Sequence, residues 1–122
     1  MANQYVYRIQ DKKGRGPFNP NITHRWIEPR SDRATMQPFF VTWPDFFPEA
    51  GTNNACACMT AKQLKRWFTA SEYQKLLSLG YRAVRMQVDA VVKQNDTQCI
   101  FKRKKALHKD VEEFELYKEG EA

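Results

Sequence analysis

The sequence predicts an α+β protein, because strand-like segments lie on both sides of a pair of helix-forming segments. Strand-forming residues alternate over 4–10, which is typical of a β-strand. The segments Thr60–Gln63 and Thr69–Glu72 have the Thr-x-x-Gln/Glu pattern of a capping box, so they mark two helix starts. A chain of 122 residues can bury one continuous core. We therefore expect a single domain over residues 1–122, with antiparallel or mixed sheets around a central helix pair.

The first half of the chain is expected to contain more loop than regular structure. A glycine-punctuated loop follows the first strand over residues 11–18, and a short helix or turn is expected over 23–27. Residues 29–54 hold four of the six prolines, and each proline removes a backbone donor. We expect this segment to be a long loop without regular structure, held against the core by its aromatic side chains (Phe39, Phe40, Trp43, Phe46 and Phe47).

The second half is expected to alternate helices with strands. A strand of small residues is predicted over 54–59, ahead of the two helices. Gly80 is well placed to end the second helix in a left-handed cap. Further strands are predicted over 81–88, 97–103 and 111–117, and the last of these belongs to an acidic C-terminal strand and tail over 110–122.

Charge is unevenly distributed along the chain. The 20 basic and 14 acidic residues give a formal net charge of +6. Residues 110–122 contain six acids and one base, so the rest of the chain carries 19 bases and 8 acids. A body this basic attracts polyanions such as nucleic acid, nucleotide phosphates or an acidic protein.

The composition also indicates the cellular compartment of the protein. No apolar run approaches the roughly 18 residues that a membrane span needs. The first residues lack the basic leader and apolar core of a secretory signal. Three cysteines are too few and too oddly numbered for a disulfide framework, so reduced thiols are expected. These features predict a cytoplasmic protein with no membrane partner.

Two candidate sites have simpler alternative interpretations. Gly14 and Gly16 could bring backbone amides close to a phosphate, or they could serve a turn that needs positive φ. The cysteines invite a zinc or a nucleophile hypothesis with His24 or His108, but their spacing lacks the Cys-x-x-Cys pattern. Buried small side chains are the better interpretation of Cys56, Cys58 and Cys99.

A run of bases, Lys102, Arg103, Lys104 and Lys105, predicts a surface for nucleic acid or another partner. A solvated charged face is the alternative interpretation of this run. The single arginine among the tyrosines of the first strand, Arg8, is a further candidate because a glycine-rich turn follows it.

Four short motifs occur in a suggestive order. They are Tyr7-Arg8-Ile9 on the first strand, a small-residue strand that runs into a helix over 55–67, a Leu79-Gly80-Tyr81 turn, and Gln98-Cys99-Ile100-Phe101 on a later strand. This order resembles the ADP-ribosyltransferase fold, over roughly residues 5–107. It is closer to small phage or prophage proteins of that superfamily than to its toxins.

The resemblance implies a site for NAD. The family places an arginine or histidine on the first strand, a serine–threonine pair on the second and a glutamate on a later one. Arg8 matches the first position, where its fork would hold the dinucleotide phosphates. Thr60 is the hydroxyl nearest the second position, and Gln98 falls at the third, with Asp96 on the same strand face.

The chain departs from the family pattern at two positions. Cys58 or Met59 stands where serine is expected. Gln98 is neutral, so it can bind a ribose hydroxyl but cannot offset the positive charge that develops as nicotinamide leaves. Asp96 would supply that charge if the register differs.

The resemblance therefore implies an NAD-binding protein that transfers ADP-ribose to a macromolecular target, with a basic body that recruits an acidic protein or nucleoprotein. Two alternatives stay open. One is a non-catalytic phage-type module that inhibits a host defence complex, as an anti-CRISPR protein does. The other is a basic nucleic-acid-binding protein that uses the run from Lys102 to Lys105.

Overall fold

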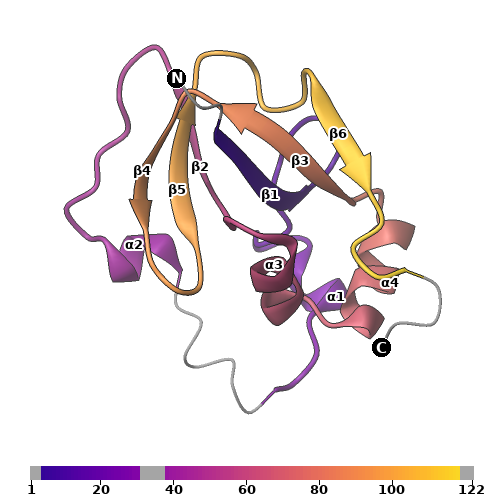
Figure 1. Cartoon of the computed structure of the whole chain (residues 1–122). Coiled ribbons are helices and arrows are strands. Elements are labelled where there is room, and N and C mark those ends of the chain that lie inside the picture. Colours follow the sequence, from indigo (N-terminus) through magenta and orange to yellow (C-terminus); the bar gives the residue numbers. More distant parts are fainter. Residues whose placement is uncertain (1–3, 31–37, 119–122) are drawn as a thin grey trace.

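Two three-stranded antiparallel sheets and four helices make up the computed structural model, which describes residues 4–30 and 38–118 (Figure 1). One sheet has the strand order β1-β3-β6 and the other β2-β5-β4. The strands are β1 (Gln4–Gln10), β2 (Asn53–Ala57), β3 (Arg82–Val88), β4 (Ala90–Gln94), β5 (Cys99–Arg103) and β6 (Val111–Phe114). The helices are α1 (Thr23–Trp26), α2 (Phe39–Thr42), α3 (Ala61–Trp67) and α4 (Ala70–Ser78).

A single bridge joins the two sheets where β1 passes the end of β2. Tyr7 and Cys58 exchange two backbone hydrogen bonds, each 2.8 Å between nitrogen and oxygen. The strand order across the junction is thus β4-β5-β2, then β1-β3-β6. In Figure 1 the two sheets stand side by side, with β1 and β2 at their meeting edge.

The core has two parts, because successive side chains of β1 point to opposite faces. Ile9 packs into a cluster with residues of three helices, among them Trp26, Leu64 and Tyr73. Val6 packs into a second cluster, which joins residues of both sheets (Ala57, Val84, Met86, Val88, Cys99 and Phe101). Helices α1, α3 and α4 lie together at one end of the sheets (Figure 1).

Most predicted elements are confirmed. The first strand has the predicted bounds, and the other predicted strands appear as β2, β3, β5 and β6 with ends that differ by a few residues. Both predicted helices begin where the capping boxes place them. The Thr69 side chain accepts from the amide of Glu72 while the Glu72 carboxylate accepts from the amide of Thr69. Gly80 has φ +95°, as a left-handed cap requires.

The predictions for 29–54 and for the segment after residue 88 need correction. A short helix, α2, interrupts the supposedly irregular segment, and Phe47 is 82% exposed rather than held against the core. The strand β4 was not expected at all. Residues 31–37 and 119–122, parts of the predicted loop and tail, lie outside the described residues.

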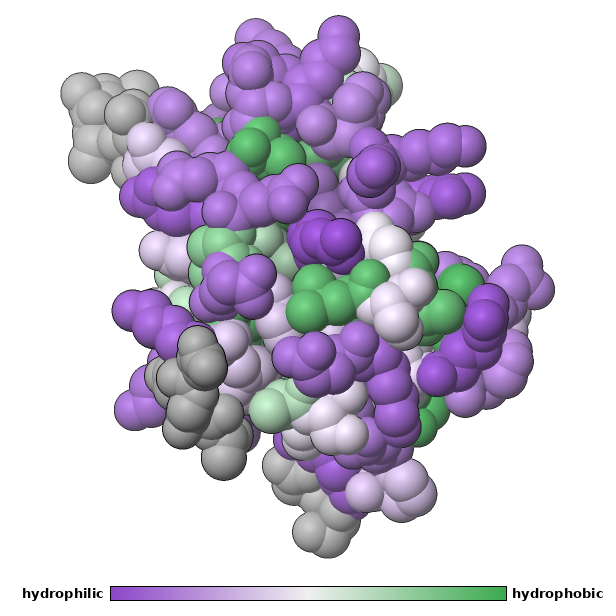
Figure 2. All heavy atoms as spheres, turned by 90° about the vertical axis from the view of Figure 1, so that its right-hand side faces the viewer, coloured by the Kyte–Doolittle hydropathy of each residue, from purple (hydrophilic) through white to green (hydrophobic). Residues whose placement is uncertain are grey.

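The surface is largely polar. Figure 2 views the molecule from the right-hand side of Figure 1. Hydrophilic side chains cover most of this face, with small apolar areas between them. Among the described residues no helix is long and apolar enough to cross a membrane.

Candidate functional site: a buried arginine and the loop beside it

Arg8 lies inside the protein at the junction of the two sheets. Its side chain is on the same face of β1 as Val6, and the residue is 6% exposed. Nη1 donates to the carbonyl oxygen of Cys56 at 2.8 Å, and Nη2 donates to the carbonyl oxygen of Gly14 at 3.2 Å. The guanidinium therefore ties β1 both to β2 and to the loop that follows β1.

The charge of Arg8 is only partly compensated. Its Nε is buried without a hydrogen-bond partner, and no carboxylate of the described residues forms an ion pair with it. Burial lowers the pKa of Arg8, and the nearby Cys56 and Asp11 counter this only in part. Since an arginine stays protonated in proteins, the site holds a positive charge that lacks a matching anion.

The loop of residues 11–16 is held in shape by Asp11. The carboxylate accepts from the amides of Lys13 and Arg15 and from Arg15 Nε, each at 2.9 Å. Burial alone would raise the pKa of Asp11, but the bonds from Arg15 and Lys13 outweigh it and lower the pKa. Asp11 is therefore ionised at neutral pH and stabilises the loop through these bonds.

The two glycines of this loop differ in what they require: Gly14 needs both its positive φ and its close approach to Leu107, whereas Gly16 lies in ordinary contact distance of Arg8. Gly14 has φ +84°, and a Cβ there would lie 2.9 Å from the Cβ of Leu107. A Cβ on Gly16 would lie 3.4 Å from Nη2 of Arg8. The structure thus brings together three residues singled out in the sequence, Arg8, Gly14 and Gly16, although Gly14 faces the cation with its carbonyl oxygen rather than with an amide.

Thr60 and Asp96 are linked at the start of α3 through Gln63, and Gln98 lies two residues after Asp96. The Thr60 hydroxyl caps the helix by accepting from the amide of Gln63 at 3.1 Å. The Gln63 side chain accepts from the amide of Met59 at 2.8 Å and donates to the carbonyl oxygen of Asp96 at 3.1 Å. Gln98 is 3% exposed just ahead of β5.

Arg8 and Thr60 border the same strand, β2, without a direct bond between them in the described part of the chain. Arg8 contacts β2 at Cys56, and Thr60 follows the strand at the start of α3. Thr60 and Asp96 are exposed, whereas Arg8 and Gln98 are buried.

The cysteines lie in the sheet interior and at its edge. Burial raises the pKa of Cys58 far above its usual range and that of Cys99 to about 12. Neither thiol is therefore a ready nucleophile at neutral pH. Within residues 4–30 and 38–118, no cluster of three or more His, Cys, Asp or Glu side chains could hold a metal ion.

The basic run from Lys102 to Lys105, which begins inside β5, contains side chains in different environments. Arg103 is 4% exposed and donates to three backbone carbonyl oxygens, those of Gln87, Ala106 and Asp110. Lys102 forms an ion pair with Glu49, and Lys105 forms one with Asp110. Lys104 is exposed. The run is thus not a continuous free basic surface.

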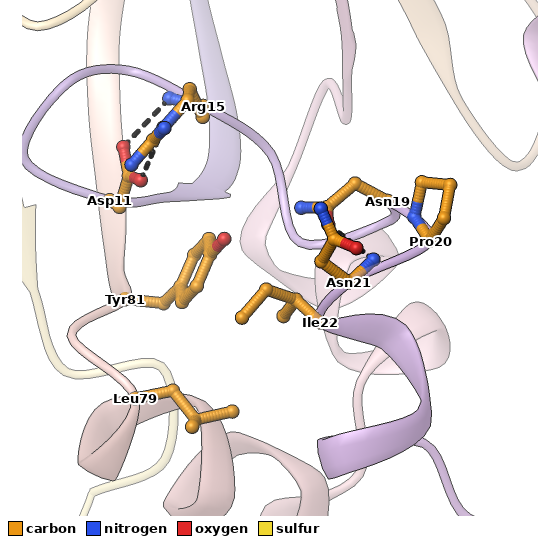
Figure 3. Close-up of a pocket in the computed structure, with 8 residues that line it drawn as sticks. All are labelled: Asp11, Arg15, Asn19, Pro20, Asn21, Ile22, Leu79 and Tyr81. Carbon is orange, nitrogen blue, oxygen red and sulfur yellow. Dashed lines mark hydrogen bonds and ion pairs between the residues drawn. The ribbon is translucent and has the colours of Figure 1, made fainter.

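A pocket of about 390 Å³ lies on the outer side of the 11–16 loop (Figure 3). It combines the Asp11–Arg15 ion pair with residues 19–22 ahead of α1 and with Leu79 and Tyr81. Sequence reasoning missed this pocket, because its three segments meet only in the folded chain. The one local signal was the i,i+4 pair of opposite charges around Gly14.

The family model described as Bacteriophage T4 Y00F protein matches residues 1–115. The chain belongs to this family. Neither the curated proteins nor the solved structures contain a match to this chain. Membership in the Y00F family supports the phage part of the sequence-based prediction, and it does not bear on the ADP-ribosyltransferase part.

Proposed function

We propose that this phage-family protein binds a dinucleotide of the NAD type on an ADP-ribosyltransferase-like fold, with transfer of ADP-ribose to a macromolecule as the activity to test. The observation that carries the proposal is the buried, incompletely compensated charge of Arg8 beside the Gly14–Gly16 loop. The remaining features of the site support it or restrict the chemistry.

The physical argument rests on the cost of burying a cation. Removing a guanidinium from water costs several kcal/mol unless its charge and its donors are matched. Two carbonyl oxygens satisfy part of the Arg8 fork, and Nε is left without a partner. A phosphate group would supply both a counter-charge and further acceptors, and planar arginine forks suit phosphate oxygens.

The strand order supports the same proposal. The resemblance assigns roles to the first strand, the second strand and a later strand. Here β2 lies between β1 and β5, since it meets β1 at the Tyr7–Cys58 bridge and pairs with β5 from Asn53 to Ala57. The three strands that would carry the site are therefore neighbours.

The chemistry available beside the ribose depends on Asp96. Neither β2 (Asn53–Ala57) nor β5 (Cys99–Arg103) contains an acidic residue. Thr60 would orient the nicotinamide ribose, and Gln98 would bind its hydroxyl. Asp96, held near Thr60 through Gln63, is the carboxylate that would stabilise the positive charge of the transition state.

A second candidate is a non-catalytic phage module that binds and inhibits an acidic host protein or nucleoprotein, such as a defence complex. The neutral Gln98 at the position where the family has glutamate favours this candidate. It retains the same fold and nucleotide site but requires no reaction.

The test is a calorimetric titration with NAD, followed by an assay of nicotinamide release in a cell lysate. We expect heat of binding from the wild type and its loss in Arg8→Met, because methionine fills the space without a charge. Arg25→Met, an exposed substitution on α1 with the same loss of charge, should bind as the wild type does.

The outcomes separate the two candidates. Nicotinamide release that Asp96→Asn abolishes, with binding retained, would establish the transferase. Binding without release would favour the non-catalytic module. Absence of both heat and release, or an Arg8→Met variant that binds NAD like the wild type, would reject the dinucleotide site.

A further inference from the structure

The pocket in Figure 3 lies beside the buried arginine but is built from different side chains. Gly14 turns its carbonyl oxygen inward to Arg8, whereas Arg15, the next residue, lines the pocket outside. The pocket has a volume of about 390 Å³ and is about half open to solvent, so a small ligand in it would stay partly exposed. The loop thus separates two sites that can be tested independently.

One side of the pocket is positively charged. Asp11 directs its carboxylate to three donors of its own loop, including Arg15 Nε. The two terminal nitrogens of Arg15 have no partner in the described part of the chain, and its side chain is 68% exposed. Lys12 and Lys13 are exposed in the same loop. An incoming anion would therefore meet available donors and a net positive field.

The opposite side offers amides and an apolar floor. Figure 3 shows Asn19 and Asn21 next to each other, facing Tyr81 across the cavity, with Ile22 and Leu79 below. Asn19 is engaged through Oδ1, which accepts from the amide of Asn21 at 3.0 Å. The Asn21 side chain is exposed and has no partner within the described residues.

These features select one class of ligand. We propose that the pocket binds a small organic anion, a carboxylate or phosphate group carried on an apolar ring or short chain. The anionic group would contact the terminal nitrogens of Arg15, while the rest of the ligand would extend over Tyr81 toward Ile22, Leu79 and the amide of Asn21 at the other end of the cavity (Figure 3). Asp11 pairs with Arg15, and the exposed Lys12 and Lys13 leave the loop with a net positive charge, so an anion is favoured over a cation. A neutral apolar molecule would offer no acceptor to the terminal nitrogens of Arg15.

The experiment is a ¹⁵N–¹H NMR titration of the whole protein with phenyl phosphate, benzoate and the neutral benzyl alcohol. We expect saturable shifts confined to residues 11–22 and 79–82 for an anion, with at least about fivefold weaker binding of benzyl alcohol. The anion that binds with the higher affinity shows whether the pocket prefers a phosphate or a carboxylate. No saturation by ~10 mM of either anion, or equal binding of benzyl alcohol, would overturn the proposal.

Three variants locate the contact. Arg15→Gln should weaken anion binding at least about fivefold, and Arg25→Gln, with the same charge change on the exposed face of α1, should leave it unchanged. Because Arg15→Gln also removes the ion pair to Asp11, Asn21→Ala provides a second test that leaves this pair intact. Unaltered binding in both pocket variants would refute the site, and NAD binding through Arg8 should survive all three substitutions.

Discussion

The buried arginines Arg8 and Arg103 differ in the hydrogen bonding of Nε. Every nitrogen position of the Arg103 fork donates to a backbone carbonyl oxygen, at 3.0, 2.7 and 3.2 Å for Nε, Nη1 and Nη2. Arg8 has two such bonds and a buried Nε with none. Arg103 therefore has a structural role, because its bonds hold the turn between β5 and β6. Arg8 retains a donor that no acceptor of the described residues satisfies.

This difference predicts unequal costs of substitution. Arg103→Met should lower the free energy of unfolding by about 2–3 kcal/mol, because three carbonyl oxygens lose their donor. Arg8→Met should change it by less than about 1 kcal/mol, because the lost bonds are offset by removal of a poorly compensated buried charge. Urea unfolding of both variants measures this, and a larger loss in Arg8→Met would contradict it.

The lowered pKa of Asp11 predicts that the stability of the protein depends on pH. Its pKa is lower in the folded than in the unfolded chain, so its contribution to stability is complete above the unfolded value of about 3.9. The contribution is lost as the pH falls through the lower, folded value. Asp11→Asn should therefore be less stable than the wild type at pH 7, and the gap should shrink below about pH 4. Unfolding curves from pH 7 to pH 3 test this, and a gap that widens on acidification would disprove it.

At the scale of elements, the start of α4 is the most interconnected helix end. Glu72 is fully buried and accepts from the amides of Thr69 and Glu28, at 3.0 and 2.9 Å. Its carboxylate also lies 3.5 Å from Nη1 of Arg30. The same side chain thus caps α4 and binds the segment that follows α1 to the start of this helix.

Glu72→Ala should accordingly cost about 3–5 kcal/mol, because it removes a cap, leaves the amides of Thr69 and Glu28 without this acceptor and takes away the carboxylate beside Arg30. Thr60→Ala, which removes the exposed cap of α3, should cost about 1 kcal/mol. Thermal unfolding of the two variants provides the comparison. Similar losses for both would show that Glu72 does no more than cap the helix.

The elements that sequence analysis missed depend on partners. The strand β4 contains only five residues and is an edge strand paired with β5, with a register shift between Val91 and Lys93. Asn95 closes this hairpin by accepting from the amides of Thr97 and Gln98. None of its side chains is buried, so its residues lack the alternation of apolar and polar positions that marks a strand in the sequence.

At the scale of the whole molecule, the two sheets are joined through β1 and β2 and share the apolar cluster around Phe101. This arrangement predicts that they unfold together. In native-state hydrogen exchange, amides of β1, β3 and β5 should show the highest and mutually similar protection, because each strand lies between two others. The edge strand β4 and residues 44–52 should exchange faster. Loss of protection in β5 at clearly lower denaturant than in β1 would show two independent units.

The local features of this protein can be predicted from its sequence. The alternation over residues 4–10, the capping residues Thr60 and Thr69 and the helix-ending Gly80 act over a few positions, so their signal is contained in their neighbours. The proximity of Arg8 to Gly14 and Gly16 also has a local cause, since a tight loop returns the chain to the strand that precedes it.

Contacts between groups far apart in the sequence follow from the folded arrangement of the strands. The folded chain shows three such contacts. It places Cys56 against Arg8, joins Asp96 to the start of α3 through Gln63, and buries Arg103 beneath the turn that follows β5. It also assembles the pocket from residues 11–22 and 79–81. Such contacts depend on strand pairing between segments that are tens of residues apart, and the hydrophobic pattern of one segment carries no information about its partner.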